Sequence, residues 1–337
     1  MLSLSSFAAH GAGFALIENS ASGMGNAYAG AAAIAEDGST IYFNPAGMTE
    51  LEGTQLTGAL HWVRPRGEFT NDGSTVASGG SLSGGNGGNN GVDAIIPNLY
   101  YSTEINDGMV FGLGINVPFG MESSYEDDWV GRYHAVDSSV MSVNINPSLA
   151  WKINEQLSFG AGISGQYIRV KLTSAIDFGA ICQALAVASC NDPQERDGFV
   201  KLDADDFSWG YNFGLLYKPQ PSTHIGFSYR SKITHSVSGD ADFSDVPAPL
   251  AASFPDTTLS SSVSLPESSS FSISHQVDQF TLLFDWTYTR WSRFKELRID
   301  YDSSQPDSVT TENWGDSSRY AIGLNYQLNP SLLLRSG

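Results

Sequence analysis

Hydrophobic and polar residues alternate along most of the chain after residue 54, with a period of two. In residues 280–288 the aromatic and aliphatic side chains fall mostly on one parity, which comprises Phe280, Leu282, Phe284, Trp286 and Tyr288. The same pattern runs through 109–117, 207–217 and 320–328. A period of two indicates β-strands with one apolar face. The pattern therefore predicts an all-β protein.

About ten segments follow this pattern. They are 54–69, 93–105, 108–119, 135–153, 157–177, 198–218, 223–243, 258–277, 279–301 and 308–328. Tight turns alternate with longer connections, and the tight turns lie at 106–107, 154–155, 220–222 and 278. Short turns on one side and long loops on the other are typical of outer-membrane barrels, whose long loops are external.

The second face of these segments separates a membrane barrel from a soluble β-sandwich, which also alternates. This face carries mostly Gly, Ser, Asn and Thr, and aromatic residues gather toward the strand ends of the apolar face. Aromatic girdles of this kind are a feature of membrane barrels. In hydrocarbon, a closed sheet also gives every backbone N–H and C=O a partner. We favour a transmembrane antiparallel β-barrel over the sandwich.

Composition narrows the functional classes. Charged residues make up only 16% of the chain, and the formal net charge is -19 with 17 Lys and Arg. So few cations argue against nucleic-acid binding, which needs them to neutralise phosphates. No apolar run reaches the roughly 18 residues of a transmembrane helix. Barrel strands of about 10 alternating residues are then the way to cross a bilayer.

The two ends of the chain carry separate signals. Residues 1–11 read as the remnant of a secretory signal that ends in the small-x-small site Ala9-His10-Gly11, and the alternative is a plain flexible N-terminus. Residues 332–337 read as the beginning of another strand. We therefore expect a barrel that is incomplete at its C-terminus.

Cys182 and Cys190 lie eight positions apart within one connection. In an exported protein such a pair predicts a loop-closing disulfide. A zinc site needs four ligands, and no His or further Cys is near in sequence. We expect no metal.

The segment from Asn19 to Met48 differs from the rest, because it is small, rich in Gly and Ala and compatible with helices. It contains the motifs Ser22-Gly23-Met24-Gly25 and Asn44-Pro45-Ala46, and further motifs include Pro97-Asn98-Leu99, Tyr229-Arg230-Ser231, Leu265-Pro266-Glu267 and Trp291-Ser292-Arg293-Phe294. With these motifs in this order, the whole chain resembles the FadL/TodX family of outer-membrane transporters for hydrophobic compounds.

The resemblance implies a barrel of fourteen strands with a helical hatch in its lumen. It assigns residues 12–51 to the hatch and 52–337 to the barrel, with about ten to eleven of the strands present. The hatch residues it points to are Phe14, Gly23, Gly25, Asn44, Pro45 and Ala46. It also implies a path: loops capture the ligand, the barrel binds it against the hatch, and it leaves sideways through a kinked third strand.

The kink is expected in the segment that contains Gly112, Gly114, Pro118, Phe119 and Gly120. Proline cannot donate a ladder hydrogen bond, and glycine weakens a strand or introduces a bulge. A lateral opening at these residues is our interpretation. The alternative is an ordinary strand end that leads into the next loop.

Apolar residues in two otherwise polar connections suggest a capture groove at the loop tips. They are Phe178, Ile181, Leu185 and Val187 in one connection, and Val246, Leu250 and Phe254 in the other. The alternative is that these side chains bury each other and close the loops.

Arg169 and Lys171 are candidates for binding a ligand carboxylate, because fatty-acid carriers of the family place basic side chains near it. Their parity matches that of Ile163 and Tyr167, on the apolar face. Interfacial snorkelling is the competing interpretation.

These observations predict an outer-membrane transporter, most of all for long-chain fatty acids. An aromatic-hydrocarbon channel and a non-transporting surface adhesin are the alternatives. Scattered His residues and the lack of a catalytic motif give no support to an enzyme. We expect a monomer without cofactors whose partners are a hydrophobic small molecule, detergent or lipid, and the lipids of the bacterial outer membrane.

Overall fold

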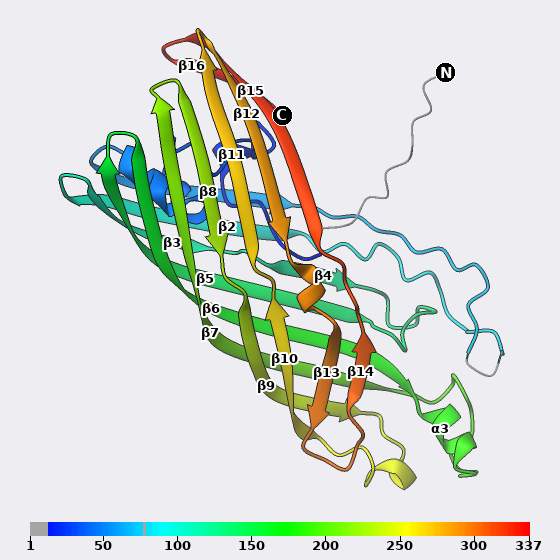
Figure 1. Ribbon diagram of the computed structural model, residues 1–337. Helices are drawn as coiled ribbons and strands as arrows, with labels where there is room; N and C mark the ends of the chain where they lie inside the picture. The colour runs from blue at the N-terminus through cyan, green and yellow to red at the C-terminus, as the bar shows by residue number, and fades with distance from the viewer. Residues whose placement is uncertain (1–12, 77–78) are drawn as a thin grey trace, which may run out of the picture.

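A computed structural model describes residues 13–76 and 79–337, which form one antiparallel sheet around a small N-terminal hatch (Figure 1). The strand order around the wall is β1-β2-β3-β5-β6-β7-β8-β11-β12-β15-β16, with β4, β9, β10, β13 and β14 off this path. The all-β prediction is confirmed. The expected signal remnant, residues 1–11, lies outside the described residues.

The strands are β1 Thr54–Val63, β2 Ala94–Asn106, β3 Met109–Asn116, β4 Gly120–Ser124, β5 Asp137–Asn154, β6 Leu157–Asp177, β7 Asp197–Gln220, β8 Thr223–Arg230, β9 Ile233–Ser244, β10 Thr257–Leu265, β11 Ser268–Val277, β12 Phe280–Thr289, β13 Glu296–Tyr301, β14 Ser308–Thr311, β15 Ser317–Asn329 and β16 Leu332–Ser336. The helices are α1 Ala21–Met24, α2 Thr40–Phe43 and α3 Phe178–Ala184, and the 3-10 helices are η1 Pro45–Glu50, η2 Ala248–Leu250 and η3 Trp291–Arg293. Among the residues described, no helix is long and apolar enough to cross a membrane.

The wall is broken along one line that the sequence did not predict. Four segments expected as single long strands are divided, into β8 and β9, β10 and β11, β12 and β13, and β14 and β15 (Figure 1). We call the part of the wall that carries the tight turns its lower part, although Figure 1 draws it uppermost. One row of paired residues ends this part: Asn212, Arg230, Ser268, Thr289 and Ser317. We call the connecting residues 231–232, 266–267, 290–295 and 312–316 the wall break.

Only β7 crosses this level unbroken among these neighbours. It pairs with β8 from Asn212 to Gln220 and with β9 from Phe199 to Asp205, which leaves 206–211 without a ladder partner on that side. Pro266 contributes to the break, because it has no N–H to donate to a ladder. Alternation of apolar and polar residues continues across the break, which explains why sequence periodicity did not reveal it.

The two faces of the wall exchange character along the longest strands. In the lower part of β6, Ser164 and Gln166 face inward and are buried, while Ile163 is exposed on the lipid side. Farther up, Ile168 is buried in the inner core and Arg169 is exposed on the outer face. The predicted single apolar face along a whole strand is therefore wrong. Above the membrane the outer face meets water, so its apolar residues move inside.

The hatch fits because the inner wall is lined by small residues. A Cβ atom on Gly160 would lie 2.4 Å from the Ala46 nitrogen, and one on Gly226 would lie 1.9 Å from the Ala32 oxygen. Any side chain at these positions would displace the hatch backbone. The inward-facing glycines thus make room for the hatch at the end of the wall with the tight turns. There Lys218 Nζ binds the Glu50 carboxylate of the hatch at 2.6 Å.

Candidate transport site

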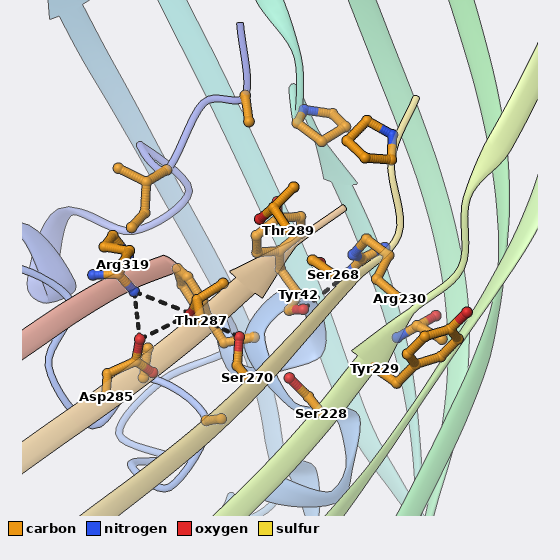
Figure 2. A pocket seen from close by; sticks show the side chains of 18 of the residues that line it. Tyr42, Ser228, Tyr229, Arg230, Ser268, Ser270, Asp285, Thr287, Thr289 and Arg319 are labelled. Carbon is orange, nitrogen blue, oxygen red and sulfur yellow. Dashed lines mark hydrogen bonds and ion pairs between the residues drawn. The ribbon is translucent and has the colours of Figure 1, made fainter. Parts of the chain in front are cut away.

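A cavity of about 300 Å³ lies between the hatch and the lower edge of the wall break (Figure 2). The hatch side is mostly apolar, and its lining includes Leu16, Ile17, Ala31, Tyr42 and Phe43. The wall side is mostly hydroxyl-bearing, and its lining includes Ser228, Ser268, Ser270, Thr287, Thr289 and Ser317. One side therefore suits an alkyl or aromatic group, and the other suits a polar group.

Arg230, the last residue of β8, points into this cavity (Figure 2). Its guanidinium lies 4.4 Å from the centroid of the Tyr42 ring and donates a hydrogen bond of 2.9 Å to the Tyr42 carbonyl oxygen. Burial raises the pKa of the Tyr42 phenol, against the opposing effect of Arg230, so the phenol is neutral. Among the carboxylates that the structure describes, none forms an ion pair with Arg230. The cavity thus contains a cation without a counter-charge.

Arg319 lines the same cavity but is already neutralised. Its Nη2 lies 2.6 Å from Asp285 Oδ1, and Asp285 also accepts a hydrogen bond from Thr287 (Figure 2). Asp285 accepts a further hydrogen bond from Ser272. Arg230, Arg319 and Asp285 were not predicted as site residues from the sequence. The alternation could have identified Arg230, because it shares its parity with Gly226 and Ser228 on the small-residue face, which lines the lumen.

Near the predicted opening at the third strand, the pairing between neighbouring strands is interrupted. β2 pairs with β3 only as far as Leu99 and Ile115, and β4 pairs with β5 alone. Residues 94–98 of β2 therefore pair with β1 but with no strand on their other side. The gap begins at 117–119, where Pro118 and Phe119 lie.

The other two residues assigned to the opening, Gly112 and Gly114, are not at the gap. Both lie in the continuous part of β3, paired with β2 and β5. A Cβ atom on Gly112 would lie 2.3 Å from Met48 Sδ, and one on Gly114 would lie 3.2 Å from Ile41. Their small size makes room for the hatch rather than weakening the wall, which corrects this part of the prediction.

The N-terminal part of the hatch occupies the gap. Leu16 N donates to the Pro118 oxygen at 2.9 Å, Gly120 N donates to the Phe14 oxygen at 3.0 Å, and Ala15 forms an antiparallel bridge with Phe119. A Cβ atom on Gly120 would lie 3.0 Å from the Leu16 side chain. Residues 14–16 thus act as a short substitute strand at the place where β2 and β4 separate.

The Phe14 ring sits in an aromatic cage. Its centroid lies 5.9 Å from Phe119, 5.0 Å from Trp291, 6.3 Å from Phe294 and 6.0 Å from Trp314. Edge-to-face pairs of this kind stabilise beyond simple burial, by about 0.5–1.5 kcal/mol each. The cage joins the gap to the wall break.

Above the cage, the inner face of the wall is apolar. The cluster that contains Phe14 continues through Ile168, Leu202, Val237, Leu259 and Val263, all buried. These residues come from β6, β7, β9 and β10. A continuous cluster of packed apolar side chains therefore extends from the outer half of the wall to the cavity level.

Other hatch residues named from the sequence hold the hatch together and against the wall. Asn44 is fully buried; its Nδ2 donates to the Ala32 and Leu215 oxygens at 2.6 and 3.0 Å, and its Oδ1 accepts from Ala46 N at 3.1 Å. Pro45 lines the cavity and begins η1. Gly23 leaves space for the Tyr28 ring, and Gly25 for Arg335.

The apolar loop residues do not form an open groove. Phe178, Cys182, Cys190 and Leu250 are buried together, and Ile181, Val187, Val246 and Phe254 pack against them. Cys182 and Cys190 form the predicted disulfide. Leu185 alone of this set is strongly exposed. The structure thus contradicts the capture groove and agrees with the alternative, in which the two loops close on each other.

Arg169 and Lys171 lie away from the cavity. Arg169 binds Asp203 through two hydrogen bonds of 2.9 and 2.8 Å, and Lys171 Nζ lies 3.9 Å from the same carboxylate. Both side chains are on the outer face of the wall and largely exposed. Carboxylate binding at this pair is not supported, because a ligand inside the barrel cannot reach it.

The sequence and the fold match known transport proteins. Residues 2–337 match the family described as outer membrane protein transport protein, OMPP1/FadL/TodX. The chain belongs to the FadL/TodX family. FadL/TodX proteins are transport proteins of the outer membrane, so this FadL/TodX chain is an outer-membrane transporter of hydrophobic compounds and not an enzyme.

Individual relatives support the same family assignment. The chain is 28% identical over 355 residues to the long-chain fatty acid transport protein of Escherichia coli O6:H1, covering 100% of this chain and 78% of that one. A Pseudomonas aeruginosa FadL homologue has the same fold, with a TM-score of 0.85 at 22% identity over 95% of this chain and 79% of the other. The Ralstonia pickettii toluene transporter TbuX matches with a TM-score of 0.68 at 21% identity, over 89% of this chain and 81% of the other. The predicted transmembrane β-barrel is confirmed.

Proposed function

We propose that the protein takes up long-chain fatty acids across the outer membrane. Arg230 carries this proposal, because it is a cation without a counter-charge in a cavity whose opposite side is apolar. A carboxylate would form a charge-assisted hydrogen bond there, the stronger kind of hydrogen bond. The acyl chain would lie against Leu16, Ile17 and Phe43 of the hatch. The fatty-acid carrier among the relatives supports the same substrate class.

The ligand would approach along the apolar inner face of the outer half. The first capture site is proposed there, around Val237 and Leu259, which are packed together in the state described here and would have to separate to admit an acyl chain. An apolar route avoids contact of the acyl chain with water and therefore lowers the barrier to entry. One chain contains its own hatch, cavity and gap, so we infer that a monomer suffices.

Exit would be lateral, through the gap between β2 and β4. In the state described here, residues 14–16 of the hatch close that gap. Release then requires the substitute strand to leave Pro118–Gly120 and the Phe14 ring to leave its cage. Lateral exit delivers an insoluble ligand without crossing the aqueous end of the barrel.

The binding claim is tested by Arg230→Gln in cells that lack their own fatty-acid carrier. We expect oleate uptake to fall roughly 10- to 100-fold, since a hydrogen bond to a charged group contributes about 1.5–3 kcal/mol. Toluene uptake should not change, because toluene has no carboxylate. Arg169→Gln is the matched control, on the outer face, and should leave oleate uptake unchanged.

The aromatic-hydrocarbon alternative keeps one observation in its favour, the aromatic cage around Phe14. If Arg230→Gln transports oleate as well as the unmodified protein does, the fatty-acid proposal is wrong. Toluene uptake by both proteins would then favour the alternative.

A further inference from the structure

The outer surface of the wall break carries a cluster of cations, which we call the interfacial cluster. It consists of Lys232, Arg290 and Arg293. All three side chains are exposed, Arg290 and Arg293 to 48% and 41%. They lie on the two sides of the 266–267 connection, because Ile233, next to Lys232, pairs with Leu265, and Arg290 N donates to the Glu267 oxygen at 3.1 Å.

The cluster lies where the lipid-facing surface ends. Directly below it the outer face is aromatic: Tyr211 bonds through its backbone to Ser231, and Tyr288 is two residues before Arg290. Trp209, Trp286 and Tyr320 extend this girdle with 67%, 40% and 67% exposure. Above it the outward residues of β9 and β10 are hydroxylated or acidic, among them Ser238, Asp240 and Ser260. Aromatic girdles mark the level of the lipid headgroups.

The carboxylates at the cluster organise the two arginines without neutralising all three cations. Glu267, whose side chain is 8% exposed, lies 3.1 Å from Arg290 Nη1 and 2.8 Å from Arg293 Nη2. Asp316 accepts hydrogen bonds from the Tyr288 hydroxyl and Ser292 N. In the described part of the chain, Lys232 forms no ion pair, so one positive charge remains.

This excess contrasts with the rest of the chain. Asp and Glu outnumber Lys and Arg by 36 to 17. Two other exposed arginines on the outer face each have a single acidic partner: Arg64 lies 3.5 Å from Asp93, and Arg169 lies 2.8 Å from Asp203. A pair of pre-positioned guanidiniums with free N–H groups beside a lysine is the arrangement that binds phosphate, because arginine matches its oxygens bidentately.

We propose that the interfacial cluster binds the phosphate of an outer-leaflet glycolipid. Its acyl chains would pack on the aromatic girdle below, and its phosphate would accept hydrogen bonds from Arg290, Arg293 and Lys232. At this level a membrane lipid can place its acyl chains on the aromatic girdle and its phosphate on the cluster at the same time. A dissolved anion could make only the second contact, so the cluster should prefer the lipid. This lipid site lies on the outside of the wall, opposite the transport cavity.

The test is native mass spectrometry of the purified full chain with diphosphoryl lipid A, dephosphorylated lipid A and phosphatidylglycerol. We expect diphosphoryl lipid A to be retained at least about fivefold more than the dephosphorylated form. Lys232→Gln and Arg290→Gln should each remove most of this difference. Arg169→Gln, an exposed and paired arginine elsewhere on the outer face, should retain it.

Two safeguards keep the result interpretable. Lys232 has no ion pair to break among the described residues, and in Arg290→Gln the Glu267 carboxylate keeps Arg293 as its partner, so neither variant leaves a buried charge alone. Millimolar inorganic phosphate should not displace the lipid. Equal retention of both lipid A forms, displacement by free phosphate, or unchanged retention by Lys232→Gln and Arg290→Gln would each overturn the proposal.

Discussion

Arg230 and Arg319 line one cavity, and the difference between them is what already neutralises each. Asp285 binds Arg319 at 2.6 Å, whereas Arg230 contacts only hydroxyl, carbonyl and aromatic groups in the described residues. A buried cation without a counter-charge costs free energy that a ligand carboxylate would recover. Residue chemistry thus supports the proposal that the polar end of the ligand binds Arg230.

Asn44 is the residue on which the hatch most depends. We expect Asn44→Ala to lower the free energy of unfolding by about 3 kcal/mol, because it removes the hydrogen bonds of the buried Ala32 carbonyl and of the Ala46 N–H and one bond to the wall. It should also speed hydrogen exchange in residues 32–50. Asn106→Ala is the control, an exposed turn asparagine. Equal unfolding midpoints for the two variants in denaturant would refute the role given to Asn44.

At the scale of elements, the exchange of faces along the strands accounts for the apolar route. Val237 in β9 is 3% exposed and faces the inner cluster, while Ser238 is exposed on the outer face. Similar reversals occur in β6 and β7 above the aromatic girdle. The reversal follows from solvent: lipid surrounds the lower part of each strand, and water surrounds the upper part.

A pair of adjacent substitutions tests this reversal. Val237→Asn should reduce oleate uptake several-fold and lower the free energy of unfolding by about 1–3 kcal/mol, the cost of a buried polar group. Ser238→Asn should change neither quantity beyond measurement error. Uptake assays and thermal unfolding of the two variants decide. If Ser238→Asn is as harmful as Val237→Asn, the assignment of faces is incorrect.

Sequence periodicity was enough to place the strands and the tight turns but not the wall break. Alternation continues through Ser231-Lys232 and Pro266-Glu267, so only the pairing of neighbouring strands shows where the ladder stops. Sequence periodicity did not predict the closing of the two loops on each other either, because their contacts join distant parts of the chain. Phe178 is buried by Phe254 and Leu250, whose chain positions are more than seventy residues away.

On the scale of the whole molecule, the hatch, the gap and the cavity form one mechanical unit. Residues 14–16 close the gap, Phe14 fills the cage at the wall break, and Leu16 and Ile17 line the cavity. In the proposed mechanism, ligand binding and gate opening therefore involve the same short segment. The family resemblance placed the lateral exit near Pro118–Gly120, but the substitute strand itself became visible only in the packed structure, because its partners are a hundred residues apart.

The proposed lateral release requires residues 14–16 to move away from the gap. A reversible lock on this segment tests the movement directly. Ala15 and Phe119 are bridge partners between flanking hydrogen bonds. Opposite residues in such a pair have Cα atoms about 4.5 Å apart, which a disulfide can span. Ala15→Cys combined with Phe119→Cys therefore allows the gate to be locked by oxidation and released by reduction.

The measurement is oleate uptake by this double variant before and after reduction, with Phe119→Cys alone as the control for the reductant and for the native disulfide. We predict that the oxidised double variant transports oleate at less than about a tenth of its reduced rate, because each 1.4 kcal/mol added to a barrier slows it tenfold. Equal uptake in the locked and released states would contradict lateral release through this gap.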